Sequence, residues 1–164
     1  MNQAPEFPPA TTAPSEPRRT GAEPQQRTFA FVDVNADSQS IIVNAPVVEV
    51  YSHCFRFEEF PVFLTSIKKI NRINETGFTC TSNIFGKEVT SFVAIIMRIP
   101  ERRIAWQSVS DHFRVGVVLF ETHTDDSTEV TVKVRSTVEP LRLKRALRRY
   151  LQNFKCFVED KHSA

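Results

Sequence analysis

Glycine is scarce in this chain of 164 residues, which contains only four glycines. They lie far apart, at Gly21, Gly77, Gly86 and Gly116. A phosphate-binding loop needs several neighbouring glycines, because its backbone amides must approach the phosphate closely. The sequence therefore argues against P-loop and dinucleotide-binding proteins.

Cysteine is also scarce, and no two cysteines have the short CxxC spacing of zinc sites. The three thiols are Cys54, Cys80 and Cys156. Their odd number and wide spacing are typical of reduced, mostly buried thiols in an intracellular protein, with Cys54 in the core. The histidines lack ligand spacing as well, and we place His53 on the surface of a helix. We therefore expect no metal ion and no cofactor.

Long apolar runs and an excess of charge are both missing. No segment approaches the roughly 20 apolar residues that a membrane-spanning helix needs, and the N-terminus has no basic-then-apolar signal peptide. The net charge is only +2, so we expect no nucleic-acid binding by the chain as a whole. These absences make a cytoplasmic protein the simplest expectation.

Proline and phenylalanine divide the chain into two parts. Six of the ten prolines precede Arg27, and residues 1–27 contain too little apolar surface to offset the entropy of ordering. We predict a disordered tail over residues 1–27, a docking segment or linker over 28–37 and one folded domain over 38–161. The chain as a whole has fourteen phenylalanines and a hydrophobic content of 41%, which indicate a core built largely on phenylalanine.

Short strand-like segments fill most of the predicted domain. Residues 38–43 predict a first strand, after which Asn44 caps a short helix with Pro46 in its first turn. Residues 57–64 predict a second short helix or turn. Turn-forming residues then separate six further strands, whose close spacing indicates an antiparallel meander. These strands are expected near residues 68–73, 78–84, 88–99, 103–108, 113–122 and 129–137.

One long amphipathic helix ends the domain, from Pro140 to about Asp160, with apolar residues at helical spacing. Its other faces carry seven basic residues, namely Arg142, Lys144, Arg145, Arg148, Arg149, Lys155 and Lys161. Such a face is most often simply solvated. The alternative is weak contact with an anionic membrane surface or an acidic partner.

The order of these segments carries a family resemblance. The matching segments are residues 40–51, 57–63, 102–109, 120, 130–132 and 151–159. Together they resemble the polyketide cyclase/dehydrase branch of the START-like (SRPBCC) superfamily, over about residues 38–160. The resemblance implies an α+β helix-grip, or Bet v 1-like, fold. In that fold a seven-stranded curved antiparallel sheet wraps on a long C-terminal helix, and two short helices follow the first strand.

The resemblance also implies a cavity for an apolar or amphipathic molecule between the sheet and the final helix. Its motifs are structural, so no catalytic residue carries over. Similar sequences usually have aromatic residues where this chain has Thr79 and Ser91, so the lining here should be smaller and more polar. The expected lining is Thr79, Thr81, Val89, Ser91, Val93, Ile95, Trp106, Val118, Phe120, Val132, Val134, Tyr150 and Phe154.

The opposite face of the sheet should then be apolar, because side chains alternate along a strand. An exposed apolar patch of this kind usually marks a contact surface. We expect residues 29–34 or a second subunit, as in a homodimer, to cover it. A register slip of one residue is the alternative, and it would swap the two faces. The interface candidates are Phe78, Phe92, Ile96, Val117 and Leu119.

Candidates for catalysis are few. Residues 108–112 bring a serine, a carboxylate and an imidazole close in sequence, but a triad needs spatial arrangement and an oxyanion hole, so a polar turn is the better interpretation. Tyr150 could donate to a ligand carbonyl and is the one weak catalytic candidate, since no good base accompanies it. Trp106 could stack on a bound ring or simply belong to the core.

These features favour binding over catalysis. We expect the protein to bind or carry a hydrophobic or aromatic small molecule, such as a lipid, a quinone or a polyketide-like compound. One alternative is a cyclase or dehydratase of the same fold. The other is a protein-interaction module that uses the apolar outer sheet face, with its cavity filled by its own phenylalanines.

Overall fold

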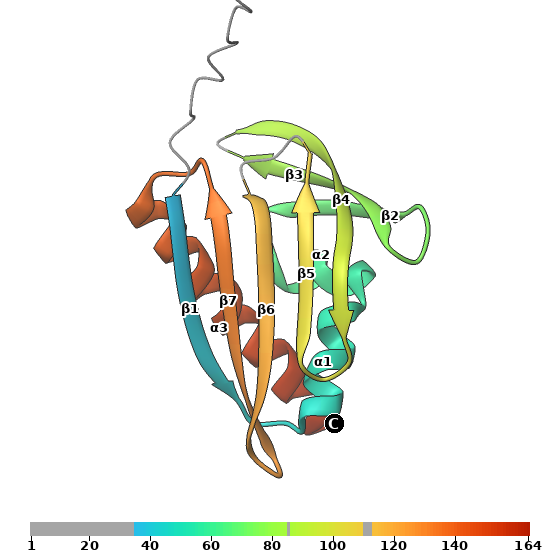
Figure 1. Cartoon of the computed structure of the whole chain (residues 1–164), viewed down its shortest axis with the longest axis vertical. Helices are drawn as coiled ribbons and strands as arrows, with labels where there is room; N and C mark the ends of the chain where they lie inside the picture. The colour runs from blue at the N-terminus through green and yellow to red at the C-terminus, as the bar shows by residue number, and fades with distance from the viewer. Residues whose placement is uncertain (1–34, 85, 110–112) are drawn as a thin grey trace, which may run out of the picture. The chain divides into compact units, whose positions relative to one another are not determined.

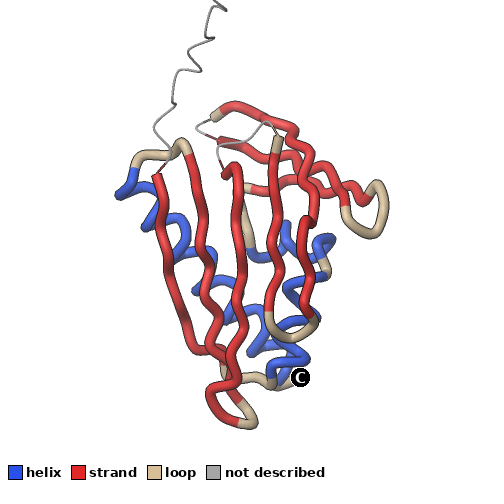
Figure 2. Tube along the Cα trace, in the orientation of Figure 1, coloured by secondary structure: helices blue, strands red, loops and turns tan. Residues whose placement is uncertain are grey.

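The computed structural model describes residues 35–84, 86–109 and 113–164, which form one antiparallel sheet with helices on one face (Figures 1 and 2). Its seven strands have the order β1-β7-β6-β5-β4-β3-β2. The elements are β1 (Asn35–Val43), α1 (Val47–Phe55), the 3-10 helix η1 (Phe57–Glu59), α2 (Phe60–Phe63), β2 (Ile67–Arg72), β3 (Gly77–Ile84), β4 (Lys87–Ile99), β5 (Arg103–Ser108), β6 (Phe113–Thr124), β7 (Ser127–Ser136) and α3 (Pro140–His162).

The predicted helix-grip fold is confirmed: the strands are antiparallel, two short helical elements follow β1, and a long helix ends the chain. β1 begins at Asn35, three residues earlier than predicted and within the segment assigned to a docking segment or linker. The predicted tail and residues 28–34 lie outside the described residues.

The junction between β1 and α1 differs from the prediction. Pro46, not Asn44, is the N-cap of α1, and no side chain caps this helix. The Asn44 backbone amide instead donates to the Glu159 carboxylate of α3 at 2.8 Å. Burial raises the pKa of Glu159, but the hydrogen bonds from Lys155 and Asn44 outweigh it and hold that pKa below its usual value. This charged contact fixes the start of α1 to the end of α3.

The long helix α3 runs obliquely behind the sheet, from beside β1 to the lower ends of the central strands, and most of its contacts with strands are to β1 (Figure 1). It starts at Glu139, whose carboxylate accepts hydrogen bonds from the amides of Leu141 and Arg142, at 3.0 and 3.1 Å. On the flank next to β1, Arg148 donates to the Gln39 side chain at 3.1 Å, and Lys155 donates to the Ile42 carbonyl at 2.6 Å. The buried stripe of α3 is Leu143, Leu147, Leu151, Phe154 and Val158.

The predicted faces of the sheet are wrong for β3 and right for β4 to β6. Phe78 is paired with Val93, and Cys80 with Ser91, so the inward positions of β3 are Phe78 and Cys80, which are 5% and 7% exposed. Thr81 faces outward, where its hydroxyl hydrogen-bonds that of Thr90 at 3.0 Å. The predicted register is therefore off by one residue for β3, and the inward and outward positions of that strand are exchanged.

Phe78 of β3 faces inward and is wrong as an interface candidate. The other four candidates lie on the outer face of β4 and β6. Phe92 and Ile96 are 39% and 56% exposed, whereas Val117 and Leu119 are half-buried on the same face. The expectation that a second subunit or residues 29–34 cover this face stays a prediction.

Trp106 is held in position by a glycine on the neighbouring strand. Trp106 of β5 pairs with Gly116 of β6, and the indole lies over the glycine so closely that a Cβ at position 116 would overlap its ring. The indole packs against all three hydrophobic core clusters that the described residues form. A glycine is therefore required beneath it.

We expect Gly116→Ala to lower the free energy of unfolding by about 1–3 kcal/mol, because the new methyl group must displace the indole. Chemical denaturation of both proteins measures the difference. The matched background is Trp106→Leu, in which the same alanine should cost far less, since no ring lies above it. An equal loss in the two backgrounds would contradict this packing.

Candidate ligand-binding cavity

A cavity of about 750 Å³ lies between the sheet and α3. Its walls come from the inner faces of β3 to β7, from α3, and from the short helical elements around Phe60. Most of the lining side chains are apolar. Eight of the residues predicted from sequence line it: Val93, Ile95, Trp106, Val118, Val132, Val134, Tyr150 and Phe154.

The other five predicted residues are not part of the lining. Thr79 and Thr81 are wrong because β3 presents the opposite face to the interior. Val89 and Ser91 share the inward face of β4 with Val93 but lie beyond the cavity. Phe120 is buried in the main core, edge-on to the Tyr51 ring at 5.5 Å.

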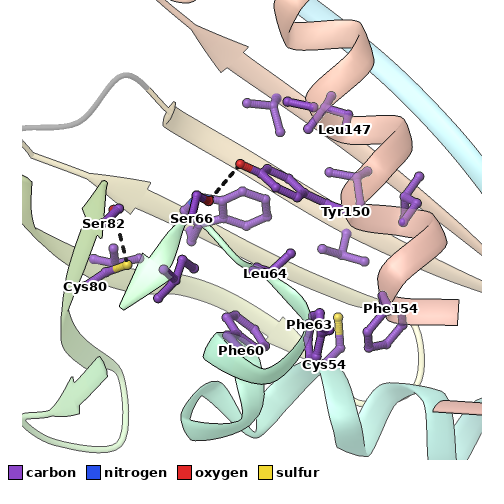
Figure 3. A pocket seen from close by; sticks show the side chains of 18 of the residues that line it. Cys54, Phe60, Phe63, Leu64, Ser66, Cys80, Ser82, Leu147, Tyr150 and Phe154 are labelled. Atoms are coloured by element: carbon purple, nitrogen blue, oxygen red, sulfur yellow. Dashed lines mark hydrogen bonds between the residues drawn. The ribbon is translucent and has the colours of Figure 1, made fainter. Parts of the chain in front are cut away.

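A row of aromatic rings closes one end of the cavity, and the sequence-based prediction missed most of it. The Phe57 ring stacks on Phe78 at 4.5 Å and meets Phe60 edge-on at 5.6 Å. Phe63 continues the row toward Phe154, at 5.4 Å between centroids. Figure 3 shows Phe60, Phe63 and Phe154 together at this end. The three-residue spacing of the phenylalanines in 57–63 was the available signal, since it predicts one helical face.

Two side chains of α3 fasten the helix to the α2 region. The hydroxyls of Tyr150 and Ser66 hydrogen-bond each other at 3.0 Å across the cavity wall (Figure 3). One turn further on, the Asn153 amide donates to the Phe63 carbonyl at 2.9 Å. The Tyr150 hydroxyl, which was the weak catalytic candidate, is therefore engaged in holding the wall.

Ser108 contributes a buried polar atom to the lining. It ends β5, on the same face as Trp106, and only 7% of its surface is exposed. Its hydroxyl has no hydrogen-bond partner among the described residues. A buried polar atom in that state costs about 1–3 kcal/mol of stability.

One thiol, that of Cys54, points toward the cavity (Figure 3). Burial raises the pKa of Cys54 to about 12, so the thiol stays protonated near neutral pH. Cys80 is buried and Cys156 exposed, so the predicted burial is wrong for Cys156. The predicted surface position of His53 is also wrong, since it is 7% exposed and its Nδ1 lies 2.8 Å from the Glu59 carboxylate.

The described cavity lining contains no aspartate, glutamate or histidine. Across the described residues, no three His, Cys, Asp or Glu side chains gather in a way that could hold a metal ion. Of the polar turn predicted at 108–112, residues 110–112 fall outside the described part. The arrangement can enclose a molecule and donate hydrogen bonds to it.

None of the helices formed by the described residues has the length and apolar character to cross a membrane.

The chain was compared with family models and with known proteins. No family model matches the chain. An uncharacterized 17.2 kDa protein from the melC2-rnhH intergenic region of Streptomyces lincolnensis is 29% identical over 133 residues, which is 75% of this chain and 89% of that protein.

Two solved structures share the fold. A START superfamily protein from Mycobacterium smegmatis superimposes with a TM-score of 0.62 at 19% identity, over 77% of this chain and 95% of that one. The Zhui aromatase/cyclase from a Streptomyces strain gives a TM-score of 0.66 at 12% identity, over 77% and 94% of the two chains. The chain therefore has a START-like fold of the polyketide cyclase type.

We expect Ser108→Ala to leave the free energy of unfolding of the ligand-free protein within about 0.5 kcal/mol of wild type, or to raise it, because the change removes an unpaired buried hydroxyl. The matched control is Ser136→Ala. The Ser136 hydroxyl is also buried but accepts a hydrogen bond from the Val138 amide at 3.0 Å, so its loss should cost about 1–3 kcal/mol. Equal losses in the two variants would show that Ser108 has a partner.

Proposed function

We propose that this protein binds a hydrophobic or aromatic small molecule in the cavity between its sheet and α3. The observation that carries the proposal is the cavity itself, with about 750 Å³ of space inside an otherwise packed domain. Sites for small molecules are typically about 300–1,000 Å³, mostly apolar and supplied with a few polar groups. This cavity has that size and that composition.

The composition of the walls supports an aromatic or alicyclic guest. The rings of Phe57, Phe60, Phe63 and Phe154 line one end, and the Trp106 indole lies in the sheet wall. Aromatic side chains bind flat rings through stacked and edge-on contacts at little entropic cost. A lipid, a quinone or a polyketide-like compound would each meet these walls.

Catalysis by the same cavity has less support. The Zhui protein is an aromatase/cyclase, and cyclisation needs a group that removes a proton. The described lining offers no carboxylate or imidazole, and the raised pKa of Cys54 keeps its thiol neutral. We therefore propose a binding or carrier protein, with a cyclase as the second candidate.

A variant that fills the cavity tests the proposal. Ala146 of α3 lines the cavity, so Ala146→Phe would place a ring inside it. We expect the wild-type chain to bind the neutral dye Nile red saturably, with a rise in fluorescence, and the variant to bind at least about tenfold more weakly. A fluorescence titration measures both.

The control for this titration is Val48→Phe, which adds the same ring to an exposed position of α1 outside the lining. Its affinity for the dye should equal that of wild type. The proposal fails if the wild-type chain shows no saturable binding, or if Ala146→Phe and Val48→Phe bind the dye equally well.

A further inference from the structure

Three arginines of α3 belong to the lining of this largely apolar cavity. Arg142, Arg145 and Arg149 occupy positions i, i+3 and i+7, which share one flank of a helix. All three line the cavity and are also exposed to solvent. They therefore lie at its mouth. The sequence placed them only on a general basic face of the helix.

The charges of Arg145 and Arg149 at this mouth are weakly compensated. The amides of Leu141 and Arg142 donate hydrogen bonds to the Glu139 carboxylate and lower its pKa, and the charges of Arg142 and Arg145 lower that pKa further. The carboxylate is therefore already bound by the start of α3. Within the described residues, Arg145 and Arg149 form no ion pair or side-chain hydrogen bond. On the opposite flank, by contrast, Arg148 and Lys155 bind groups of β1.

The polar and aromatic ends of the cavity are separated along α3. Arg145 and Phe154 are nine positions apart in the helix, which is roughly 14 Å at 1.5 Å per residue. Ser108, whose hydroxyl has no partner among the described residues, is the last residue of β5. That end of β5 lies at the end of the sheet where α3 begins (Figure 1). Arg142, Arg145 and Ser108 thus belong to one end of the cavity, and Arg149 lies between that end and Phe154. Phe60, Phe63 and Phe154 form the other end (Figure 3).

We infer that the ligand is an amphipathic anion, with an apolar or aromatic body among the phenylalanines and a carboxylate at the mouth. This inference rests on the proposed binding function and names the chemistry of its ligand. Guanidinium groups bind carboxylates through paired, charge-assisted hydrogen bonds. A neutral ligand of the same shape would leave Arg145 and Arg149 with water alone.

A matched pair of probes tests the inference: pyrenebutyric acid and pyrenebutanol share one body and differ in their charge. The full chain should bind the acid on the order of tenfold more tightly than the alcohol, in calorimetric titrations at physiological ionic strength. In the double variant Arg145→Gln/Arg149→Gln the ratio of the affinity for the acid to the affinity for the alcohol should fall toward one. The ratio in wild type should also fall as salt is added.

Arg148→Gln is the matched control, because it removes the same charge from the same helix on the flank next to β1. It should keep most of the preference for the acid. Equal affinity of the wild-type chain for acid and alcohol would overturn the inference while leaving the proposed function intact. If neither probe nor Nile red binds, the proposed function fails and the inference fails with it.

An anionic membrane surface is the other partner that these arginines could meet. Vesicles containing phosphatidylserine separate the two. If the double variant loses vesicle binding but keeps the wild-type ratio of acid to alcohol, the arginines act on a membrane and the inference is wrong. If the ratio collapses and vesicle binding is unchanged or absent, the inference holds.

Discussion

A seven-stranded sheet is much wider than the one long helix that packs on it, and this mismatch in width determines most of the architecture. Six spacings between strands of about 4.8 Å give a sheet roughly 29 Å wide, whereas a helix with its side chains is about 10 Å across. α3 runs obliquely across this face and is fastened to β1 through Arg148 and Lys155. The inner faces of the remaining strands need another cover.

The short elements after β1 close the far side without filling the space. Phe57, Phe60 and Phe63 supply the ring wall, and two hydrogen bonds, Tyr150 to Ser66 and Asn153 to Phe63, tie that wall to α3. The sheet contributes mostly valines and isoleucines at the cavity, and Gly116 leaves room for the Trp106 indole to lie against its strand. Space therefore remains where a larger or looser side chain would have occupied it.

The fold was predictable because the lengths of the apolar segments and the turns between them are plain in the sequence. The faces of β3 were predicted wrongly because the family resemblance placed Thr79 on the cavity side. The alternation of Phe78-Thr79-Cys80-Thr81 itself favours burial of Phe78 and Cys80, which is what the structure shows. The neighbouring strand β4 is apolar on both faces, so it gives no independent check. Pairing with Ser91 and Val93 decides the matter, and pairing is a tertiary property.

The candidate site was only half predictable for a related reason. Sheet positions such as Val93 and Trp106 follow from alternation, but the three arginines look like ordinary solvated residues until the mouth of the cavity is located beside them. His53 was misplaced because its burial depends on Glu59 and Phe157, which lie on other elements. Long-range contacts supply what local pattern does not contain.

The cavity and its arginine-lined mouth together fit an amphipathic ligand. The most direct test is to look for a bound molecule in protein purified from cells. Native mass spectrometry of the full chain, purified without detergent or lipid extraction, should show one added small molecule per protein. On denaturation that molecule should be released as an organic acid. A bare protein mass, unchanged after incubation with a small-molecule extract of the same cells, would contradict a ligand-binding role.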